Sequence, residues 1–334
     1  MSRFTSHRSW AALLGIAAGV TASAMAGSAA HASAIASDNA SGLNSTSGAA
    51  LTTGATGGYG FGAWTLVGGN SAGPYAGEYA DTSSKGVASS NGNSWGVYAN
   101  SGTATSTPRI DLFRPFNAAL ASGQTFSVAL ESDSVGSDVY GTPPTYHSNG
   151  LPAIGFSLQS GSSTTVSSGT TAMTVGTASY NAGSYTNPNA LFTVSFTELG
   201  PTETLNGQTN SGGYALQTNI TDANGTSSVL SSGSNAINEA QLSAGITAAF
   251  ALGNAGAYTL TLSSVGATPA VLATYTGTVS GTINSADLFD QATAQNGYFN
   301  NLSIANTAVP EPATIGLFIA AGAGLLLVRR RRMA

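Results

Sequence analysis

The segment Gly92-Asn93-Ser94-Trp95-Gly96 fits the pattern G-x-S-x-G, which in serine hydrolases places a nucleophilic serine on a sharp turn between a strand and a helix. His147 lies downstream as a base, and Asp133 or Asp138 would orient it. The residues that follow Ser94 favour a strand instead of a helix. We therefore predict a turn between strands and no enzyme activity, with a secreted serine hydrolase using Ser94 and His147 as the least favoured alternative.

Glu131, Asp133 and Asp138 form a local acidic cluster whose carboxylate oxygens are the kind of ligand that Ca²⁺ takes in proteins. No D-x-D-x-D-G loop accompanies them, so a solvated loop is the preferred interpretation and bound Ca²⁺ is the alternative. The chain has no Cys and three His, which removes cysteine-based zinc sites and iron–sulfur clusters. We predict no metal site and no cofactor.

Trp64, Trp95 and Tyr98 are the candidate sugar-binding residues, because an aromatic face can stack on a sugar ring. The alternative is that these side chains pack inside a sheet, where aromatic residues are common. Arg109, Asp111 and Arg114 lie within a short interval and favour structural ion pairs, with a contact to an anionic sugar as the alternative.

The positive charge of this chain is concentrated at its two ends. Charged residues make up 7% of the sequence, against about 25% in an average soluble domain. Between the ends the basic residues are Lys85, Arg109 and Arg114, so the middle of the chain is acidic. An acidic body repels phosphate backbones, and we predict no nucleic-acid partner.

Residues 1–32 have the three parts of a secretory signal peptide: a basic start, an apolar run and small residues before a cleavage site. Arg3 and Arg8 provide the basic part, and the apolar run is Ala11–Val20. Cleavage is predicted after Ala32, or alternatively after Ala26, and the Sec translocon is the expected partner. An uncleaved membrane anchor is disfavoured, because the apolar run is short and rich in alanine.

Residues 309–334 combine a proline-stiffened stretch, an apolar span and a block of arginines. As a helix, Ala313–Val328 would be about 24 Å long at about 1.5 Å per residue. A bilayer core of about 30 Å needs about 17–25 residues, so this predicted transmembrane helix is barely long enough. The arginines resist translocation and hold the C-terminus in the cytoplasm. They are Arg329, Arg330, Arg331 and Arg332.

This tail resembles a PEP-CTERM sorting signal of Gram-negative bacteria. The match consists of the short apolar span, the arginine cluster and the residues Val309, Pro310, Glu311, Pro312 and Ala313. The resemblance implies that an exosortase, a membrane-embedded protease, recognises the Pro-Glu-Pro region and removes the helix. The protein would be anchored transiently in the inner membrane and then pass to the cell surface or the extracellular matrix, in association with exopolysaccharide and biofilm. The alternative is a permanent single-pass anchor.

Between the two ends we predict a flexible lead-in over residues 33–57 and one all-β domain over residues 58–308. The lead-in is small and polar and has little apolar surface to bury. The domain contains short runs rich in β-branched and aromatic residues, separated by Gly, Ser and Asn. The expected strands are Tyr59–Leu66, Ser94–Tyr98, Thr125–Glu131, Ala153–Leu158, Leu191–Thr197, Tyr214–Thr221, Ala257–Ser263, Val271–Thr276 and Tyr298–Ile304. Asn238–Leu252 is the best helix candidate, although much of it would also suit a strand.

This number of short strands suggests a single jelly-roll or lectin-like β-sandwich. Trp95–Gly102, Arg114–Phe116 and Gly123–Val128 are similar to the opening half of jelly-roll domains in secreted bacterial proteins, and Tyr298–Ile304 is similar to their closing strand. The preferred hypothesis is a non-enzymatic, exported surface or matrix protein. The alternative is a lectin-like carbohydrate-binding module.

Overall fold

The part of the chain from Ala34 to Thr307 forms one compact unit. The structure is a computed structural model. It describes residues 34–42, 51–68, 76–82, 85–88, 91–99, 109–133, 135, 152–162, 164, 166–168, 171–173, 185–199, 204–211, 215–233, 235–291, 293 and 295–307.

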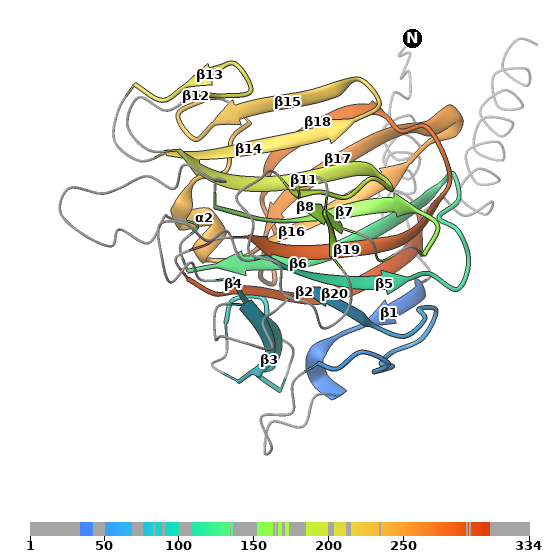
Figure 1. The fold of residues 1–334 in the computed structure, drawn as a ribbon. Coiled ribbons are helices and arrows are strands. Elements are labelled where there is room, and N and C mark those ends of the chain that lie inside the picture. The colour runs from blue at the N-terminus through green and yellow to red at the C-terminus, as the bar shows by residue number, and fades with distance from the viewer. Residues whose placement is uncertain are drawn as a thin grey trace, which may run out of the picture. The chain divides into compact units, whose positions relative to one another are not determined.

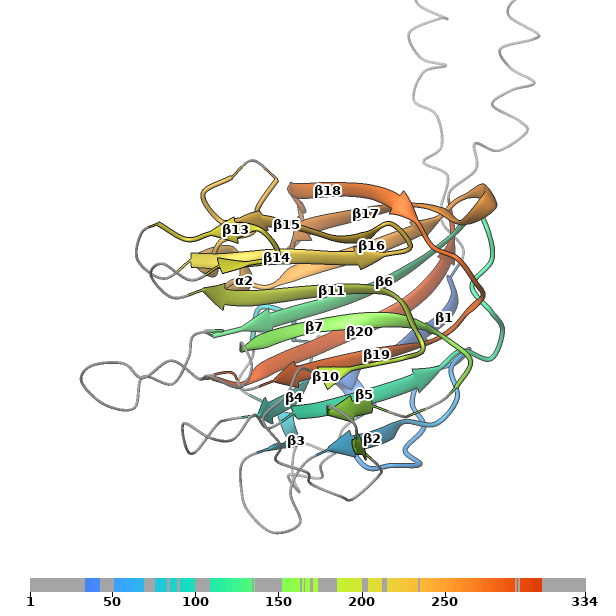
Figure 2. The ribbon, with the colours of Figure 1, turned by 45° about the horizontal axis from the view of Figure 1, so that its top comes forward.

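Two large antiparallel sheets make up this unit (Figures 1 and 2). Sheet I has eight strands: in spatial order β18 (Val271–Thr278), β17 (Ala257–Ser264), β16 (Ile246–Leu252), β6 (Gln124–Ser132), β20 (Gly297–Asn306), β4 (Ser94–Ala99) and β3 (Ala76–Asp81), with β1 (Ala34–Asp38) also paired to β20. Sheet II has seven strands: β15 (Gly225–Leu230), β14 (Ala215–Asp222), β11 (Ala190–Leu199), β7 (Ala153–Ser160), β19 (Ile283–Gln291), β5 (Arg109–Pro115) and β2 (Thr65–Gly68).

Smaller elements complete the described fold. They are a three-stranded sheet of β10 (Tyr185–Thr186), β8 (Val166–Ser168) and β9 (Thr171–Met173), a hairpin of β12 (Thr204–Leu205) and β13 (Gln208–Thr209), and the short helices η1 (Ala40–Gly42), α2 (Glu239–Ser243) and η2 (Asn254–Gly256).

The hydrophobic core lies between the two sheets and follows from the alternation of side chains along each strand. Phe126, Val128 and Leu130 of β6 are fully buried, as are Phe156 of β7 and Phe250 of β16. All five belong to one core cluster that takes residues from both sheets. Aromatic rings connect the layers, because Phe126 and Phe156 approach to 5.9 Å between ring centroids. The two sheets therefore form a sandwich, and each sheet has an inner and an outer face.

The prediction of an all-β fold is confirmed. Eight of the nine expected strands coincide with β4, β6, β7, β11, β14, β17, β18 and β20. The ninth, Tyr59–Leu66, is mostly irregular and reaches β2 at its end. The strands β3, β5, β15 and β19 were not predicted. In β5 and β19 charged residues interrupt the apolar pattern.

The helix expected over Asn238–Leu252 is wrong for most of its length. A five-residue helix, α2, begins after Asn238, whose side chain caps it and whose backbone N–H is capped in return by Gln241. Gly245 then adopts a φ of +89°, which ends the helical path. Strand β16 follows, because Ile246, Ala248 and Phe250 alternate into the core.

The flexible lead-in predicted for residues 33–57 is also wrong where the structure describes it. Strand β1 pairs antiparallel with β20, with Ala34 opposite Ala305, so the β-sandwich begins before residue 58. Asp38 at the end of β1 forms a 2.6 Å ion pair with Arg114 of β5. The small polar residues of this segment do not predict a strand. The strand is stabilised by partners that are far away in the sequence.

The predicted signal peptide and sorting tail lie outside the described residues, and so do Val309–Ala313 and Arg329–Arg332. Within the described ranges, no helix is long and apolar enough to cross a membrane.

Candidate functional site

The outer face of sheet II is polar because every second residue of its central strands is polar. Ser157 and Gln159 of β7 point outward between the core residues Ile154, Phe156 and Leu158. The outward positions of the neighbouring strands carry Thr193, Ser195 and Thr197 on β11, Asn219 and Thr221 on β14, Asp287 and Phe289 on β19, and Arg109 and Asp111 on β5. The pleat therefore brings amide, hydroxyl, carboxyl and guanidinium groups together on one surface.

Arg109 brings a positive charge to this face, and its partners hold it in one orientation. Its Nε donates to both carboxylate oxygens of Asp111, at 2.9 and 3.0 Å, and its Nη2 lies 2.6 Å from Asp111 Oδ1. Its Nη1 donates to Gln291 Oε1 at 3.2 Å. The guanidinium also lies 4.3 Å from the centre of the Phe289 ring. The positive charge is therefore offset by a neighbouring carboxylate and fixed in place.

Asp287 provides a second carboxyl group beside Asp111, and it is fully buried. Asn187 Nδ2 donates to Asp287 Oδ2 at 3.0 Å and to Gln159 Oε1 at 2.8 Å. Burial raises the pKa of Asp287 well above its ordinary value, the nearby Asp111 raises it further, and Arg109 acts in the opposite direction. Asp287 therefore favours its protonated form, which lowers the net negative charge of the face.

A groove of about 340 Å³ lies on this face. It is lined by Arg109, Ser157, Asn187, Ala190, Leu191, Phe192, Thr193, Thr221, Asp222 and Phe289. These residues come from β5, β19, β7, β11 and β14 and from the turn before β11, so the groove runs across strands. Four strand intervals correspond to about 19 Å at about 4.8 Å each.

The floor of the groove combines one aromatic ring with fixed polar groups. A Cβ atom at Gly155 would lie 3.0 Å from Phe289 Cζ, so the ring packs closely against the bare backbone of β7. Ser157 Oγ and Thr193 Oγ1 are 2.9 Å apart and share a hydrogen bond. Asn187 is fixed by a turn in which its Oδ1 accepts from the Asn189 N–H at 3.1 Å. Of these groups, Ser157 and Phe289 are buried beneath the groove, whereas Asn187 and Thr193 are partly exposed.

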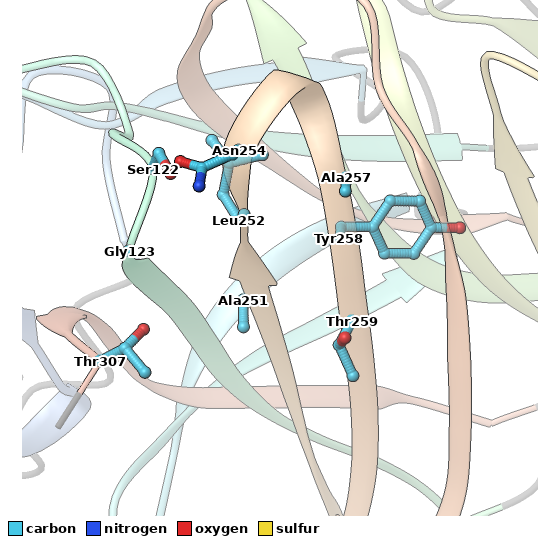
Figure 3. A pocket seen from close by; sticks show the side chains of 10 residues that line it. Ser122, Gly123, Ala251, Leu252, Asn254, Ala257, Tyr258, Thr259 and Thr307 are labelled. Atoms are coloured by element: carbon cyan, nitrogen blue, oxygen red, sulfur yellow. Dashed lines mark hydrogen bonds between the residues drawn. The ribbon is translucent and has the colours of Figure 1, made fainter. Parts of the chain in front are cut away.

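A larger hollow of about 570 Å³ lies on sheet I (Figure 3). Ser122 Oγ donates to Asn254 Oδ1 at 2.8 Å, and the two side chains point toward each other. The ring of Tyr258 points away from them. The remaining lining residues are small or apolar apart from Thr259 and Thr307. Few polar groups converge here, so the groove on sheet II is the better candidate site.

Two of the three residues predicted to contact a sugar are in the core. Trp64 is 1% exposed and Trp95 is 2% exposed, and their rings meet at 5.1 Å between centroids. Neither ring presents a face to solvent. Both are core residues, which was the alternative interpretation of these tryptophans. Tyr98 differs, because it is half-buried on the outer face of sheet I.

The structure does not support a nucleophilic Ser94. Its side chain is fully buried at the start of β4, where Oγ lies 3.4 Å from Asp81 Oδ2. A strand follows it instead of a helix, and His147 lies outside the described residues.

The acidic residues considered for Ca²⁺ have other partners. Glu131 accepts from the Val87 N–H at 3.2 Å, and Asp133 forms a 2.7 Å ion pair with Lys85. Asp138 lies outside the described residues. Among those the structure does describe, no three His, Cys, Asp or Glu side chains come together as metal ligands.

Structural ion pairs at Arg109 and Arg114 are confirmed, although the two arginines use different faces of β5. Arg109 pairs with Asp111 on the outer face, and Arg114 pairs with Asp38 on the inner face. Sequence reasoning missed Asn187, Thr193, Asp287 and Phe289 as site residues. The signal available was the alternation of acidic and apolar residues over Ser285–Gln291 and the Asn-Pro-Asn turn at 187–189.

Comparison with known proteins identifies no family. No family model and no curated protein matches the sequence. Among solved structures, an alginate lyase from Pseudomonas aeruginosa shares 9% identity over 60% of this chain and 74% of the lyase chain, with a TM-score of 0.31. The globular domain of calreticulin from T. cruzi shares 8% identity over 80% of this chain and 95% of that chain, with a TM-score of 0.38.

The ligand-binding domain of botulinum neurotoxin serotype D, solved with N-acetylneuraminic acid, shares 9% identity over 86% of this chain, with a TM-score of 0.35. This chain spans 50% of that neurotoxin chain. At such identities and TM-scores, none of these likenesses says what the present chain binds.

Proposed function

We propose that this chain is an exported, non-enzymatic β-sandwich protein that binds a neutral saccharide in the groove on sheet II. The observation that supports the proposal is the groove of about 340 Å³ on sheet II. This groove runs across the strands, and polar side chains in fixed orientations surround Phe289 in it. Ligand pockets typically have volumes of about 300–1,000 Å³ and contain a few fixed polar groups beside apolar ones. The architecture is proposed to be a lectin-like jelly roll, since chain segments switch between the sheets from β4 to β7 and from β19 to β20.

A neutral saccharide suits the charge of the groove. Arg109 is paired with Asp111, and the raised pKa of Asp287 favours its uncharged form, so the positive charge that the described residues bring to the groove is offset by a carboxylate. The formal net charge of −5 for the whole chain also opposes an anionic polymer. A polyhydroxylated ligand gains hydrogen bonds from the amide, hydroxyl and carboxyl groups of the floor, which are already held in place.

Filling the groove is expected to abolish saccharide binding. Thr221 is exposed at the groove rim, and the Thr221→Trp side chain would occupy the space of a sugar unit. We expect binding of cellohexaose or mannohexaose at this site, measured by titration calorimetry, to weaken at least tenfold, which is about 1.4 kcal/mol.

The matched control is Thr259→Trp, which fills the hollow on sheet I instead. The affinity of Thr259→Trp for the same hexasaccharide should equal that of the unmodified protein. Equal affinities for Thr221→Trp and the unmodified protein would reject the groove as the binding site.

Delivery to the surface is proposed to use the two ends of the chain. The support is the sequence: the signal peptide at 1–32, the Val309-Pro310-Glu311-Pro312-Ala313 segment, the apolar span and Arg329–Arg332. In this proposal an exosortase removes the tail after export, and the saccharide groove then meets exopolysaccharide at the surface or in the matrix.

Processing predicts a defined change of mass. The extracellular form should begin after Ala32 or Ala26 and should lack Arg329–Arg332, which intact-mass spectrometry would show. An extracellular protein that retains the four arginines would exclude exosortase processing and leave the binding proposal untouched. Replacing Pro310, Glu311 and Pro312 with alanine should leave the tail attached if the Pro-Glu-Pro segment is recognised.

A further inference from the structure

A cluster of tyrosines occupies the outer face of sheet I, on the opposite side of the sandwich from the groove. In the pairing of β3 with β4, Tyr79 lies opposite Gly96 and Tyr98 lies opposite Gly77. Strand β20 adds Tyr298 on the other side of Gly96. Each ring on β3 or β4 thus faces a residue without a side chain. The sequence places glycine where a Cβ atom would exclude the rings.

The rings of Tyr79 and Tyr98 lie directly on the backbone of the neighbouring strand. A Cβ atom at Gly96 would be 2.5 Å from Tyr79 Cζ, and one at Gly77 would be 2.6 Å from the Tyr98 hydroxyl oxygen. Both tyrosines are nevertheless partly exposed. One side of each ring therefore rests on the sheet, and part of each side chain remains accessible to solvent.

The surrounding contacts hold this surface rigid. Asn296 Nδ2 donates to the Tyr79 hydroxyl at 2.7 Å. Tyr298 packs edge-on against Tyr79, with centroids 6.4 Å apart and an angle of 80° between planes. Lys85 Nζ lies 4.5 Å from the centre of the Tyr298 ring and 2.7 Å from Asp133 Oδ2. A surface that is already ordered loses little side-chain entropy when a ligand binds.

We propose that Tyr79 and Tyr98 form a second saccharide-binding site, the tyrosine platform, that stacks against pyranose rings. The face of a pyranose carries C–H bonds whose partial positive charge is attracted to the negative face of an aromatic ring. The two ring centroids are 6.4 Å apart and the ring planes are inclined by 47°, so each ring would stack on a different sugar unit. The inference takes its ligand class from the proposed function but uses a different face.

Charged and amide groups lie around the tyrosine platform, and this polar surrounding favours a sugar ligand over a protein partner. The Asn296 amide contacts the Tyr79 hydroxyl, and the Lys85 ammonium and the Asp133 carboxylate lie beside the neighbouring Tyr298. These groups can exchange hydrogen bonds with sugar hydroxyls. A stable protein interface needs about 800 Å² on each partner, which two half-buried rings do not supply.

Two sites on opposite outer faces would make the protein bivalent. The groove lies on the outer face of sheet II, the platform lies on the outer face of sheet I, and the shared core separates the faces. Two separate polysaccharide strands could then be held by one molecule, which raises the strength of attachment without new contacts. This property suits a protein placed in a polysaccharide matrix.

Titration of the full chain in detergent micelles with cellohexaose tests the platform. Tyr98→Ala should weaken binding at the platform about tenfold and reduce the number of sites from two to one. Tyr98→Phe keeps the ring and should bind as the unmodified protein does. A second variant, Gly77→Val, should displace the Tyr98 ring and have the effect of Tyr98→Ala.

The variants separate the two proposals. If Thr221→Trp loses one site and Tyr98→Ala loses none, the platform is rejected and the groove stands. If Tyr98→Ala loses a site and Thr221→Trp loses none, the platform stands and the groove is rejected. If the unmodified protein binds neither cellohexaose nor mannohexaose, both are rejected. Self-association that disappears in Tyr98→Ala, seen by light scattering without sugar binding, would also reject the platform, since the face would then be an interface between copies.

Discussion

Replacing Arg114 with methionine is expected to lower the free energy of unfolding by about 3–5 kcal/mol. Arg114 is fully buried and its Nη2 lies 2.6 Å from Asp38 Oδ2 and 2.6 Å from the Gly57 carbonyl oxygen. Its guanidinium carbon is 4.9 Å from the centre of the Trp64 ring. Methionine preserves much of the volume but leaves the Asp38 carboxylate buried without its counter-ion, which is the costly part.

The loss should also depend on pH. Burial already raises the pKa of Asp38, and Arg114 opposes that rise. Without Arg114 the folded pKa of Asp38 rises further above its unfolded value, so the variant loses more stability as the pH increases. Urea unfolding at pH 5 and pH 8 would measure this, with the larger difference between Arg114→Met and the unmodified protein expected at pH 8.

The matched control breaks a partly exposed ion pair. Lys85 and Asp133 are 19% and 39% exposed, and Lys85→Met should cost less than about 1 kcal/mol. Equal losses for Arg114→Met and Lys85→Met would show that β1 does not depend on its buried ion pair.

Asp290→Asn is expected to remove a large part of the pH dependence of stability. Asp290 lies on the inner side of β19 and is fully buried, and burial raises its pKa to about 8. Its Oδ1 accepts from Thr293 Oγ1 at 2.6 Å. The folded protein therefore keeps a proton on Asp290 that the unfolded chain releases above about pH 4.

A raised pKa of this kind gives a stability that falls with rising pH. The contribution is complete below the unfolded pKa of 3.8 and is lost as the pH rises toward 8. Over pH 4 to 7 the loss from this one group is about 4 kcal/mol at about 1.4 kcal/mol per pH unit. Asparagine does not ionise and can still accept from Thr293, so Asp290→Asn should be the more stable protein at pH 7.

Unfolding free energies measured from pH 4 to 8 would show a smaller slope for Asp290→Asn than for the unmodified protein. The raised pKa of Asp287 adds a slope of the same sign to both proteins and cancels in the comparison. Asp133→Asn is the control, since its carboxylate is partly exposed and ion-paired, and its slope should stay close to that of the unmodified protein. Identical slopes for all three proteins would mean that Asp290 is ionised in the folded state.

Some of the site could be predicted from the chain alone, and some could not. The alternation Ile154, Phe156, Leu158 against Gly155, Ser157, Gln159 indicated a strand with one apolar and one polar face. It did not indicate that the polar face would carry Arg109 beside Asp287, because these residues lie far apart in the sequence and meet through the pairing of β5 with β19. Glycines at 77, 96 and 155 resembled loop residues until their neighbours across the sheet were known.

The sequence by itself determined eight of the strands, the low charge of the body and the chemistry of the two chain ends, since these depend on residue types and short-range spacing. The tertiary structure decided which side chains are accessible and which charges are paired. Trp64 and Trp95 have the chemistry of sugar-stacking residues but face the core, whereas Tyr98 faces outward. Arg114 finds its partner 76 residues away in Asp38. Burial and ion pairing depend on contacts between strands that are far apart in the sequence and meet only in the folded sandwich. Local sequence patterns do not predict such long-range contacts.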